Sequence, residues 1–324
     1  MAPIALIVNR NCRQNRKDPG TPERLRQLLG PGALFFATHD ADSLRMAAQA
    51  CRAAGVGVVG IHGGDGTLHW TATQLIHAYQ GERLPALAFL RGGTQNTIAN
   101  SCGVSASPER VLAYLAEVGA RGGAPVLIER DILRIGPAAQ AGIAPTERSD
   151  RYGFIFGNGF VYQFLAEYYG LGEPSQWNAL RTLVSGCWSV ATRGALAERM
   201  FRRFRGRVLV DGALWPAQEF TGVVGSTIEQ VGLGFRPFVR CDERPGAFHL
   251  LGITASAAGF AAELPKIRLG MPLCDRKILN AVCREVVFEA EEPLRYIIDG
   301  DLHEASNRLE LGVGPRLRLV VPQR

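Results

Sequence analysis

Residues 62–67 have the sequence HGGDGT and directly follow the apolar run 56–61, VGVVGI. A second stretch of this kind, residues 91–96 (RGGTQN), follows the apolar run 84–90, LPALAFL. Glycine lets backbone N–H groups come close to a bulky anion, because no Cβ intervenes. A helix that starts just beyond such a loop adds free N–H donors and the positive end of its dipole. The two loops therefore predict neighbouring phosphate-binding turns, and Asp65 in the first loop suggests a metal–nucleotide complex.

The first part of the chain, residues 1–124, alternates strand-like and helix-like segments. Continuous apolar strands that alternate with helices predict a parallel sheet covered on both faces. Ligands of such sheets bind at the carboxyl ends of the strands, where both glycine loops lie. We expect strands at 3–8, 34–37, 56–61 and 84–90. We expect helices at 21–29, 42–54 and 67–79, a short helix that ends at 102, and a helix from 107 to about 119.

Beyond the glycine pair at 122–123, strand-like segments dominate, which predicts a second, β-rich and sandwich-like domain over 125–307. We expect the segment at about 308–324 to return to the first domain as a strand. The fold class is thus α/β, with an N-terminal parallel-sheet domain and a β-rich second domain. One helical insertion is expected at 176–203 and a loop at 137–150. The expected strands of this part are 126–135, 152–156, 207–214, 220–224, 247–253, 285–289, 295–298 and 316–321.

The formal charge of the 324-residue chain is +6, and only Lys17, Lys266 and Lys277 are lysines. Arginine suits phosphate and phospholipid head groups, although a genome-wide bias toward arginine explains the composition equally well. The seven scattered cysteines show no metal-binding spacing and indicate a reducing compartment. The longest uncharged apolar stretch, 250–262, is too short to span a bilayer. We therefore expect a cytoplasmic protein that can contact the inner face of a membrane.

Two common nucleotide-binding motifs are excluded. Gly55, Gly57 and Gly60 match the text G-x-G-x-x-G, but this match follows a predicted helix and falls within a predicted strand. A dinucleotide fingerprint must instead follow a strand and open a helix. The P-loop motif G-x-x-x-x-G-K-[ST] is absent, and no lysine lies near either glycine loop. The sequence therefore lacks a dinucleotide fingerprint, and a P-loop enzyme is excluded.

Residues 63–67 (GGDGT), followed about 25 residues later by Gly-Thr-x-Asn at 93–96, resemble the diacylglycerol kinase catalytic domain. This family includes bacterial lipid kinases and sphingosine and ceramide kinases, and it shares its nucleotide-binding fold with NAD kinases. The resemblance extends over nearly the whole chain. It implies transfer of the γ-phosphate of Mg-ATP to a lipid hydroxyl, with ATP and Mg2+ as cofactors.

The resemblance also assigns roles to particular residues. It implies that Asp301, in Asp299-Gly300-Asp301, is the general base, where the family has a glutamate, and that Asp65 is the second catalytic group. Asp131 and Asp299 would support the site. Asp65, acting through phosphate, and Asp242 are the candidate metal ligands. The implied nucleotide-binding residues are Asn9, Thr38, His62, Gly63, Gly64, Asp65, Gly66, Thr67, Leu68, Gly93, Thr94 and Asn96.

The sequence departs from the family pattern at several of these places. Asp301 is one methylene shorter than the usual glutamate, and its Asp-Gly neighbours are also typical of a hairpin turn. Thr97 stands where the family commonly has aspartate. Pro245 stands where bacterial members have an aspartate of a structural magnesium site. By contrast, the Asn158-Gly159 pair keeps the family pattern, because it matches an asparagine turn of the family.

A basic segment lies near three large apolar residues, Met200, Phe201 and Phe204. Such a segment suits an anionic membrane surface; a solvated helix face that buries its aromatic residues in the core is the alternative. No nucleic-acid-binding module is present, and the histidines other than His62 are expected to be structural. The arginines of the segment are Arg193, Arg199, Arg202, Arg203, Arg205 and Arg207.

Three functions follow from the sequence. The first is a lipid kinase that acts on a diacylglycerol or a sphingoid-type lipid. The second is a relative of NAD kinase, although the Asn-Glu pair that such enzymes use on their acceptor is not evident. The third is a catalytically silent regulator that binds nucleotide or lipid, which the changes at Asp301, Thr97 and Pro245 motivate. The sequence leaves open the acceptor lipid and whether the protein is a homodimer.

Overall fold

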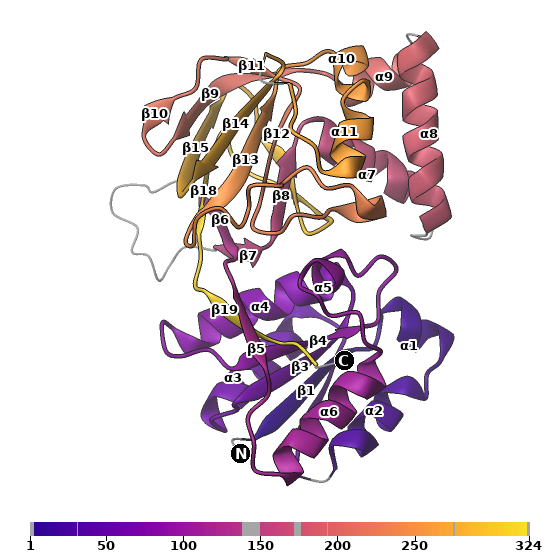
Figure 1. Ribbon diagram of the computed structural model, residues 1–324, viewed down its shortest axis with the longest axis vertical. Helices are drawn as coiled ribbons and strands as arrows, with labels where there is room; N and C mark the ends of the chain where they lie inside the picture. The colour runs from indigo at the N-terminus through magenta and orange to yellow at the C-terminus, as the bar shows by residue number, and fades with distance from the viewer. Residues whose placement is uncertain are drawn as a thin grey trace. The chain divides into compact units, whose positions relative to one another are not determined.

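The structure, a computed structural model, describes residues 3–30, 32–137, 150–171, 176–192, 194–274 and 276–322. The chain divides into two compact units (Figure 1). Unit 1 consists of Met1–Arg130 and Pro315–Arg324, and unit 2 of Asp131–Gly314. The sequence placed these divisions at 124/125 and about 307/308. Most of the expected loop at 137–150 lies outside the described residues.

The sheet of unit 1 has the strand order β2-β1-β3-β4-β19-β5. All neighbouring strands pair in parallel except β5, which is antiparallel to β19. Strand β3 is buried along its whole length and β4 along all but its last residue, as continuous apolar strands require when both faces are covered. The strands are β1 (Ile4–Asn9), β2 (Leu34–Thr38), β3 (Val58–Gly63), β4 (Ala86–Arg91), β5 (Leu127–Arg130) and β19 (Leu317–Val320).

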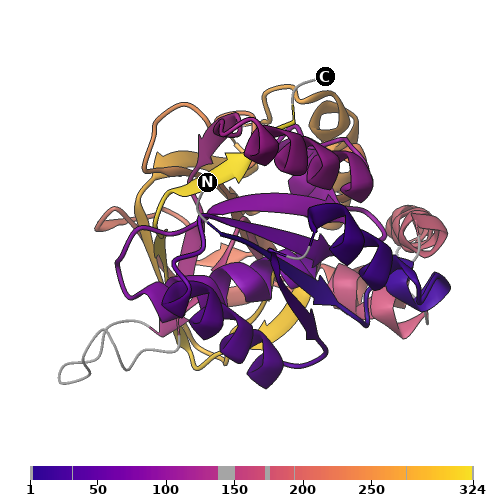
Figure 2. The same ribbon diagram turned by 90° about the horizontal axis from the view of Figure 1, so that it is seen from below.

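Helices lie on both faces of this sheet (Figures 1 and 2). Helix α3 packs against α4, and α2 packs against α6. The sequence specifies their starts: Asp40 and Ser43 form a capping box at α3, and the Ser107 side chain caps α6 ahead of Pro108. The helices are α1 (Arg13–Lys17), α2 (Thr21–Leu29), α3 (Ala41–Ala53), α4 (Asp65–Tyr79), α5 (Thr97–Ser101) and α6 (Pro108–Ala120).

Unit 2 is built on two antiparallel sheets. One has the order β10-β9-β15-β18-β6-β7, with β11 beside β9, and the other has the order β14-β13-β12-β8-β16-β17. The strands are β6 (Leu133–Pro137), β7 (Arg151–Gly153), β8 (Ile155–Asn158), β9 (Phe204–Val210), β10 (Ala213–Leu214), β11 (Glu219–Phe220), β12 (Gly222–Ser226), β13 (Phe248–Ile253), β14 (Ile278–Cys283), β15 (Glu285–Ala290), β16 (Arg295–Ile298), β17 (Asp301–Glu304) and β18 (Arg308–Val313).

Apolar side chains from both sheets of unit 2 share one core. Phe156 on β8 lies 5.4 Å from Phe288 on β15, measured between ring centroids, and 5.8 Å from Tyr296 on β16. All three rings are buried in one cluster with residues of both sheets, such as Leu250 and Leu311. The sheets therefore pack face to face, which confirms the predicted combination of a parallel-sheet domain and a sandwich-like β-rich domain.

Helices cover a second apolar cluster in unit 2. Phe160, at the start of α7, contacts Phe260 on α10 at 4.6 Å and Phe201 at 5.5 Å between ring centroids. The sequence predicted a helical insertion at 176–203, but α7 precedes it and was missed. The helices are α7 (Phe160–Gly170), α8 (Gln176–Thr192), α9 (Ala195–Met200), the 3₁₀ turn η2 (Gly232–Gly234), α10 (Ala257–Ala261) and α11 (Leu264–Leu269).

Several runs that the sequence predicted as single strands are divided. The run 207–214 becomes β9 and β10, and the run 220–224 becomes β11 and β12. The run 126–135 becomes β5 in unit 1 and β6 in unit 2, and the run 152–156 is divided at Phe154 between β7 and β8, which belong to different sheets. The segment 308–324 likewise contributes β18 to unit 2 and β19 to unit 1. Extended-chain propensity does not say which sheet a residue joins, so these divisions are not visible in the sequence. No helix among the described residues is both long enough and apolar enough to cross a membrane.

Candidate functional site

The two glycine loops touch through their backbones at one end of the unit 1 sheet. Gly63 and Arg91 are paired where β3 and β4 end, and the Gly92 N–H donates to the Gly63 carbonyl at 2.8 Å. A Cβ placed on Gly93 would lie 2.5 Å from the Cα of Gly64, so this approach requires glycine. The loops that the sequence predicted to be neighbours are therefore adjacent.

The ends of β1 and β2 join the same group. The Asn9 side-chain amide donates to Thr67 Oγ1 at 2.9 Å, which ties the end of β1 to the first glycine loop. The Arg10 N–H donates to the Thr38 carbonyl at 2.9 Å. Since a hydroxyl both accepts and donates, the Thr67 proton can still be donated to a ligand.

The N-terminus of α4 is open to an anion. Its N-cap is Gly64, which has no side chain, and the helix has no side-chain cap hydrogen bond. The amides of Asp65, Gly66 and Thr67 belong to the first turn, whose N–H groups have no partner within a helix. A glycine-capped helix of 15 residues presents these donors together with the positive end of its dipole. The residues present therefore fit a phosphate group.

The N-terminus of α5 is occupied by protein groups. The Asp65 carboxylate accepts from the Thr97 N–H and the Ile98 N–H, each at 3.0 Å. Asn96, which adopts a left-handed conformation with φ of 51°, accepts from the Gly93 N–H at 2.9 Å through its Oδ1. The expectation that the amides of both turns hold phosphate together is thus wrong for these three amides, because two side chains already bind them.

The Asp65 carboxylate is largely enclosed, and burial raises its pKa while the Ile98 and Thr97 N–H groups lower it. The amides at the start of α5 offset the carboxylate's charge. The Thr97 side chain is a third hydrogen-bond partner of this carboxylate. A carboxylate has about four lone-pair positions, so these three bonds leave room for one further ligand. The role of Asp65 as metal ligand or catalytic group stays a prediction, and the visible role is a bridge between the two loops.

His62 is fully buried beneath the second loop. Its Nδ1 faces the Asn15 amide nitrogen at 3.4 Å and its Nε2 faces Gln14 Oε1 at 3.3 Å. Burial lowers the pKa of His62 to about 4, so the ring is neutral near pH 7. A Cβ on Gly92 would come within 2.9 Å of Nε2. The side chain supports helix α1 and the second loop from within, so the predicted contact of His62 with nucleotide could be made only through its backbone and stays a prediction.

Two further predicted nucleotide-binding residues have buried side chains. The Thr38 hydroxyl donates to the Val8 carbonyl at 3.4 Å, and the Leu68 side chain is in the core. Any contact that these residues make with a ligand would be through the backbone. Thr94 lies in the second loop and is half buried.

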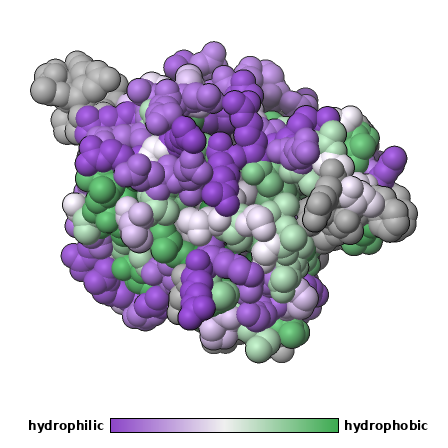
Figure 3. All heavy atoms as spheres, turned by 90° about the horizontal axis from the view of Figure 1, so that it is seen from above, coloured by the Kyte–Doolittle hydropathy of each residue, from purple (hydrophilic) through white to green (hydrophobic). Residues whose placement is uncertain are grey.

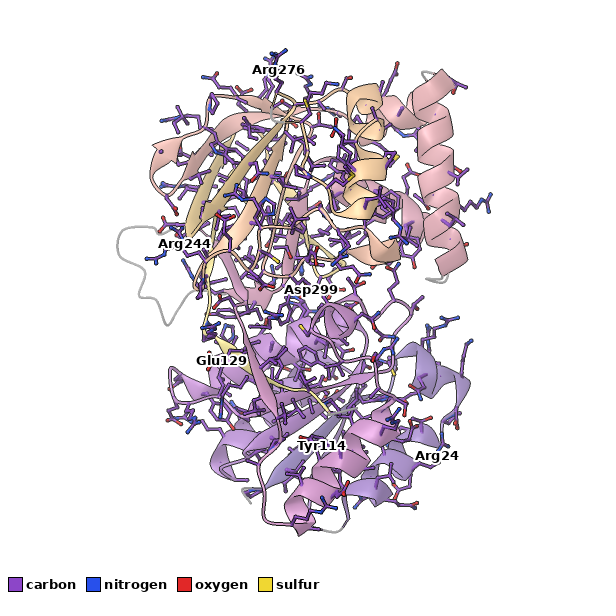
Figure 4. The ribbon with its side chains drawn as sticks, in the orientation of Figure 1. Arg24, Tyr114, Glu129, Arg244, Arg276 and Asp299 are labelled. Atoms are coloured by element: carbon purple, nitrogen blue, oxygen red, sulfur yellow. The ribbon has the colours of Figure 1, made fainter. Side chains whose placement is uncertain are left out.

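In unit 2, Asp299 and Gly300 form the two-residue turn of the β16–β17 hairpin. Ile298 pairs with Asp301, and the turn residues have φ of 49° and 99°. The Asp299 carboxylate accepts from the Phe154 N–H at 2.9 Å and from the Ile155 N–H at 2.7 Å (Asp299 is labelled in Figure 4). Asp299 therefore fixes the turn to the crossing between β7 and β8, which fits its predicted supporting position.

Asp301 is the first residue of β17 and is half buried. The Tyr169 hydroxyl, at the end of α7, donates to the carbonyl of the preceding residue, Gly300, at 2.8 Å. Sequence reasoning missed Tyr169 because it did not predict α7, and no local motif marks the residue.

The turn at 240–246 is held by protein groups. The Asp131 carboxylate accepts from the Gly246 N–H at 2.8 Å, and the Arg240 guanidinium pairs with Glu243 at 2.6 Å. The buried His249 accepts from the Arg240 N–H at 3.4 Å, and burial lowers its pKa to about 4. Nowhere in the described ranges do three or more His, Cys, Asp or Glu side chains gather to hold a metal. The role of Asp242 as a metal ligand therefore stays a prediction without a visible set of partner ligands.

The pair Asn158-Gly159 links β8 to α7. Asn158 Oδ1 accepts from the Val223 N–H at 2.6 Å. Gly159 has φ of 61°, and a Cβ there would lie 2.1 Å from the Thr221 carbonyl oxygen. The asparagine turn is thus a structural junction that directs the chain into α7.

The predicted basic segment is compensated by carboxylates. Its aromatic residues pack inward: Phe201 stacks on Phe160, and Phe204 stacks on Phe220. Figure 3 shows one face of the molecule, on which apolar residues lie between hydrophilic ones. These contacts favour the solvated-face interpretation, and Arg193 lies outside the described residues. The ion pairs are Arg199–Glu167, Arg202–Glu292, Arg203–Glu219, Arg205–Glu219 and Arg207–Glu289.

Comparisons with known proteins agree with the family suggested by the glycine loops. Residues 3–122 match the family model of the diacylglycerol kinase catalytic domain. No curated protein matches the sequence at a significant level.

Similar solved structures come from Bacillus anthracis str. Sterne. A diacylglycerol kinase is 14% identical with a TM-score of 0.63, covering 98% of this chain and 96% of its own. Two structures assigned provisionally as diacylglycerol kinases are each 16% identical, with TM-scores of 0.70 and 0.68. Both cover 98% of this chain, and the coverage of their own chains is 96% and 97%. At this identity the likeness establishes the fold over both units.

The buried His62 makes stability depend on pH. The unfolded chain takes up a proton near pH 6.5, whereas the folded protein does so only near 4. The stabilising effect of the neutral ring is therefore complete above about pH 6.5 and is lost as the pH falls toward 4. We expect His62→Gln to make the decline in free energy of unfolding shallower by about 1 kcal/mol per pH unit in this window.

The measurement is urea unfolding at several pH values between 7 and 4. The exposed His77→Gln, on α4, is the control and should keep the wild-type slope. Equal slopes for His62→Gln and the wild type would contradict the assignment of a neutral, buried ring.

The bridge made by Asp65 gives a second prediction. Asparagine at this position offers one acceptor oxygen in place of two and places an N–H group toward the second amide. We expect Asp65→Asn to lower the free energy of unfolding by about 2 kcal/mol and to weaken nucleotide binding at every Mg2+ concentration. The exposed Asp42→Asn is the matched control. Unchanged stability with only a raised Mg2+ requirement would instead identify Asp65 as a metal ligand.

Proposed function

We propose that the protein is a lipid kinase that transfers the γ-phosphate of Mg-ATP to a hydroxyl of a diacylglycerol or sphingoid-type lipid. The observation that carries the proposal is the open N-terminus of α4, where Gly64 replaces a side-chain cap. A long helix whose first turn is left without a partner group suits a phosphate. The family of residues 3–122 supports a nucleotide as the source of that phosphate.

The surroundings of this helix terminus support the same proposal. Thr67 accepts a hydrogen bond from Asn9 and has a proton left to donate. The carboxylate of Asp65, which lies in the first glycine loop, is bound to the amides of Thr97 and Ile98. Its negative charge is thereby offset, which lowers its repulsion of a bound phosphate.

Magnesium fits this site only in part. Mg2+ in nucleotide sites is commonly bound by one or two carboxylates together with phosphate oxygens, and Asp65 is the carboxylate that this chain would contribute. When bound, the ion would neutralise charge on the phosphates. Because no larger set of ligands gathers in the described residues, we assign no further step to the metal.

The acceptor hydroxyl needs a group that takes its proton. We assign this role to Asp301: the acceptor oxygen forms a bond to the γ-phosphorus, its proton passes to the Asp301 carboxylate, and ADP leaves with the electrons of the broken P–O bond. Asp299 is unsuited to the role because its carboxylate binds the Phe154 and Ile155 amides. The match of residues 3–122 to the diacylglycerol kinase catalytic domain supports a lipid as the acceptor.

The expected setting of this activity is the cytoplasm, with peripheral contact at a membrane where the lipid is found. This part of the proposal rests on the chemistry of the acceptor. The ion pairs of the arginine segment make a purely electrostatic attachment through that segment less favourable.

The test is an assay of phosphate transfer from γ-labelled ATP to diacylglycerol, ceramide or sphingosine in mixed micelles, with the products separated by chromatography. We expect a labelled lipid with the wild-type protein. Asp301→Asn should lower kcat by about 100-fold or more without changing the affinity for ATP. Glu304→Gln, an exposed carboxylate on the same strand, is the matched control and should retain activity.

Three outcomes would contradict the proposal. Formation of NADP from NAD would identify an NAD kinase relative. Binding of ATP without transfer to any hydroxyl acceptor would identify a silent regulator. Full activity of Asp301→Asn would refute the assigned base.

A further inference from the structure

We infer that Tyr169 is a positioning residue for the proposed catalytic base, acting through the carbonyl of Gly300. The inference rests on the proposed function, in which Asp301 receives the proton of the acceptor. Tyr169 is the second-last residue of α7, and its hydroxyl donates to the Gly300 oxygen at 2.8 Å. The contact joins residues 131 positions apart in the sequence.

The peptide plane explains how this contact reaches Asp301. The Gly300 carbonyl and the Asp301 N–H belong to one planar peptide unit, which also ends at the Cα of Asp301. Gly300 has φ of 99°, a conformation in which glycine has wide freedom to rotate. A hydrogen bond that holds the carbonyl therefore also restricts the orientation of the strand residue that carries the base.

The other side of the turn is fixed by the sheet. Asp299 accepts from the Phe154 and Ile155 amides, and its own N–H donates to the Ile155 carbonyl at 3.0 Å. Gly153 leaves no space for movement there, because a Cβ at that position would lie 2.2 Å from Ile298 Cγ2. The hydrogen bond from Tyr169, which lies outside the sheet, thus adds a constraint on Gly300.

Helix α7 is anchored well enough to transmit such a constraint. Its first residue, Phe160, packs on Phe201 and Phe260 in the second apolar cluster. Near its end, Tyr168 is buried and its ring lies 5.1 Å from that of Tyr169, measured between centroids. The position of the Tyr169 hydroxyl is therefore set by the packing of unit 2.

Replacing tyrosine by phenylalanine isolates the hydroxyl. The Tyr169 side chain is 38% exposed, so Tyr169→Phe keeps the ring and its packing and leaves the Gly300 carbonyl with access to water. We expect the midpoint of thermal unfolding to stay at the wild-type value. The matched control is Tyr162→Phe, on the same helix and half buried.

The experiment measures phosphate transfer from labelled ATP to diacylglycerol in mixed micelles, with full kinetics for both variants. We expect Tyr169→Phe to lower kcat by about 10- to 100-fold, because a small displacement of a catalytic group has effects of this size. KM for ATP and for lipid should stay close to the wild-type values. In the Asp301→Asn background, Tyr169→Phe should cause no further loss, since the two residues act as one unit.

The inference is overturned if kcat of Tyr169→Phe equals that of the wild type, or if the loss is as large in the Asp301→Asn background. A raised KM with unchanged kcat would also overturn it, because that pattern belongs to a binding residue. Lack of transfer by the wild-type protein would refute the proposed function and the inference with it. An unchanged kcat of Tyr169→Phe, or an equal loss in the Asp301→Asn background, would leave the proposed function intact.

Discussion

The hydrogen bonds between the Asp65 carboxylate and the amides of Thr97 and Ile98 are the constraint on which the glycine-loop end of unit 1, the proposed nucleotide site, depends. They span more than 30 residues of sequence and hold the second glycine loop against the first, where Gly64 and Gly93 leave no space for a side chain. A carboxylate placed near a phosphate site would ordinarily repel the ligand. Here its charge is offset by the N-terminus of α5.

This constraint gives the two helix N-termini different uses. Helix α5 is capped internally by Asp65, while the longer α4 begins at Gly64 and keeps its first amides available. The first turn therefore offers the proposed phosphate site, and the second turn is braced against it by side-chain hydrogen bonds. In unit 2, Asp299 is bound to the amides of Phe154 and Ile155, and Asp301, the first residue of β17, is the carboxylate to which we assign the proposed chemistry.

The sequence was sufficient to predict the fold class and the meeting of the glycine loops, because the alternation of strand-like and helix-like segments and the glycine spacing are visible in the local sequence. It did not predict that His62 points into the core or that Asp65 caps α5, because both depend on contacts between segments. Helix α7 was also missed, and with it Tyr169. Its sequence, FVYQFLAEYYG, is rich in aromatic residues, which tertiary packing stabilises as a helix against their strand propensity.

The most direct measurement of the central claim is an NMR titration of 15N-labelled protein with Mg-ATP, in which the backbone amide signals are followed individually. The account predicts that the signals of Gly64, Asp65, Gly66 and Thr67 shift with the bound fraction. The amides of Thr97 and Ile98 should keep their protection from hydrogen exchange in the absence and presence of nucleotide. Unmoved signals at the start of α4, with shifts concentrated on Thr97 and Ile98, would contradict the account.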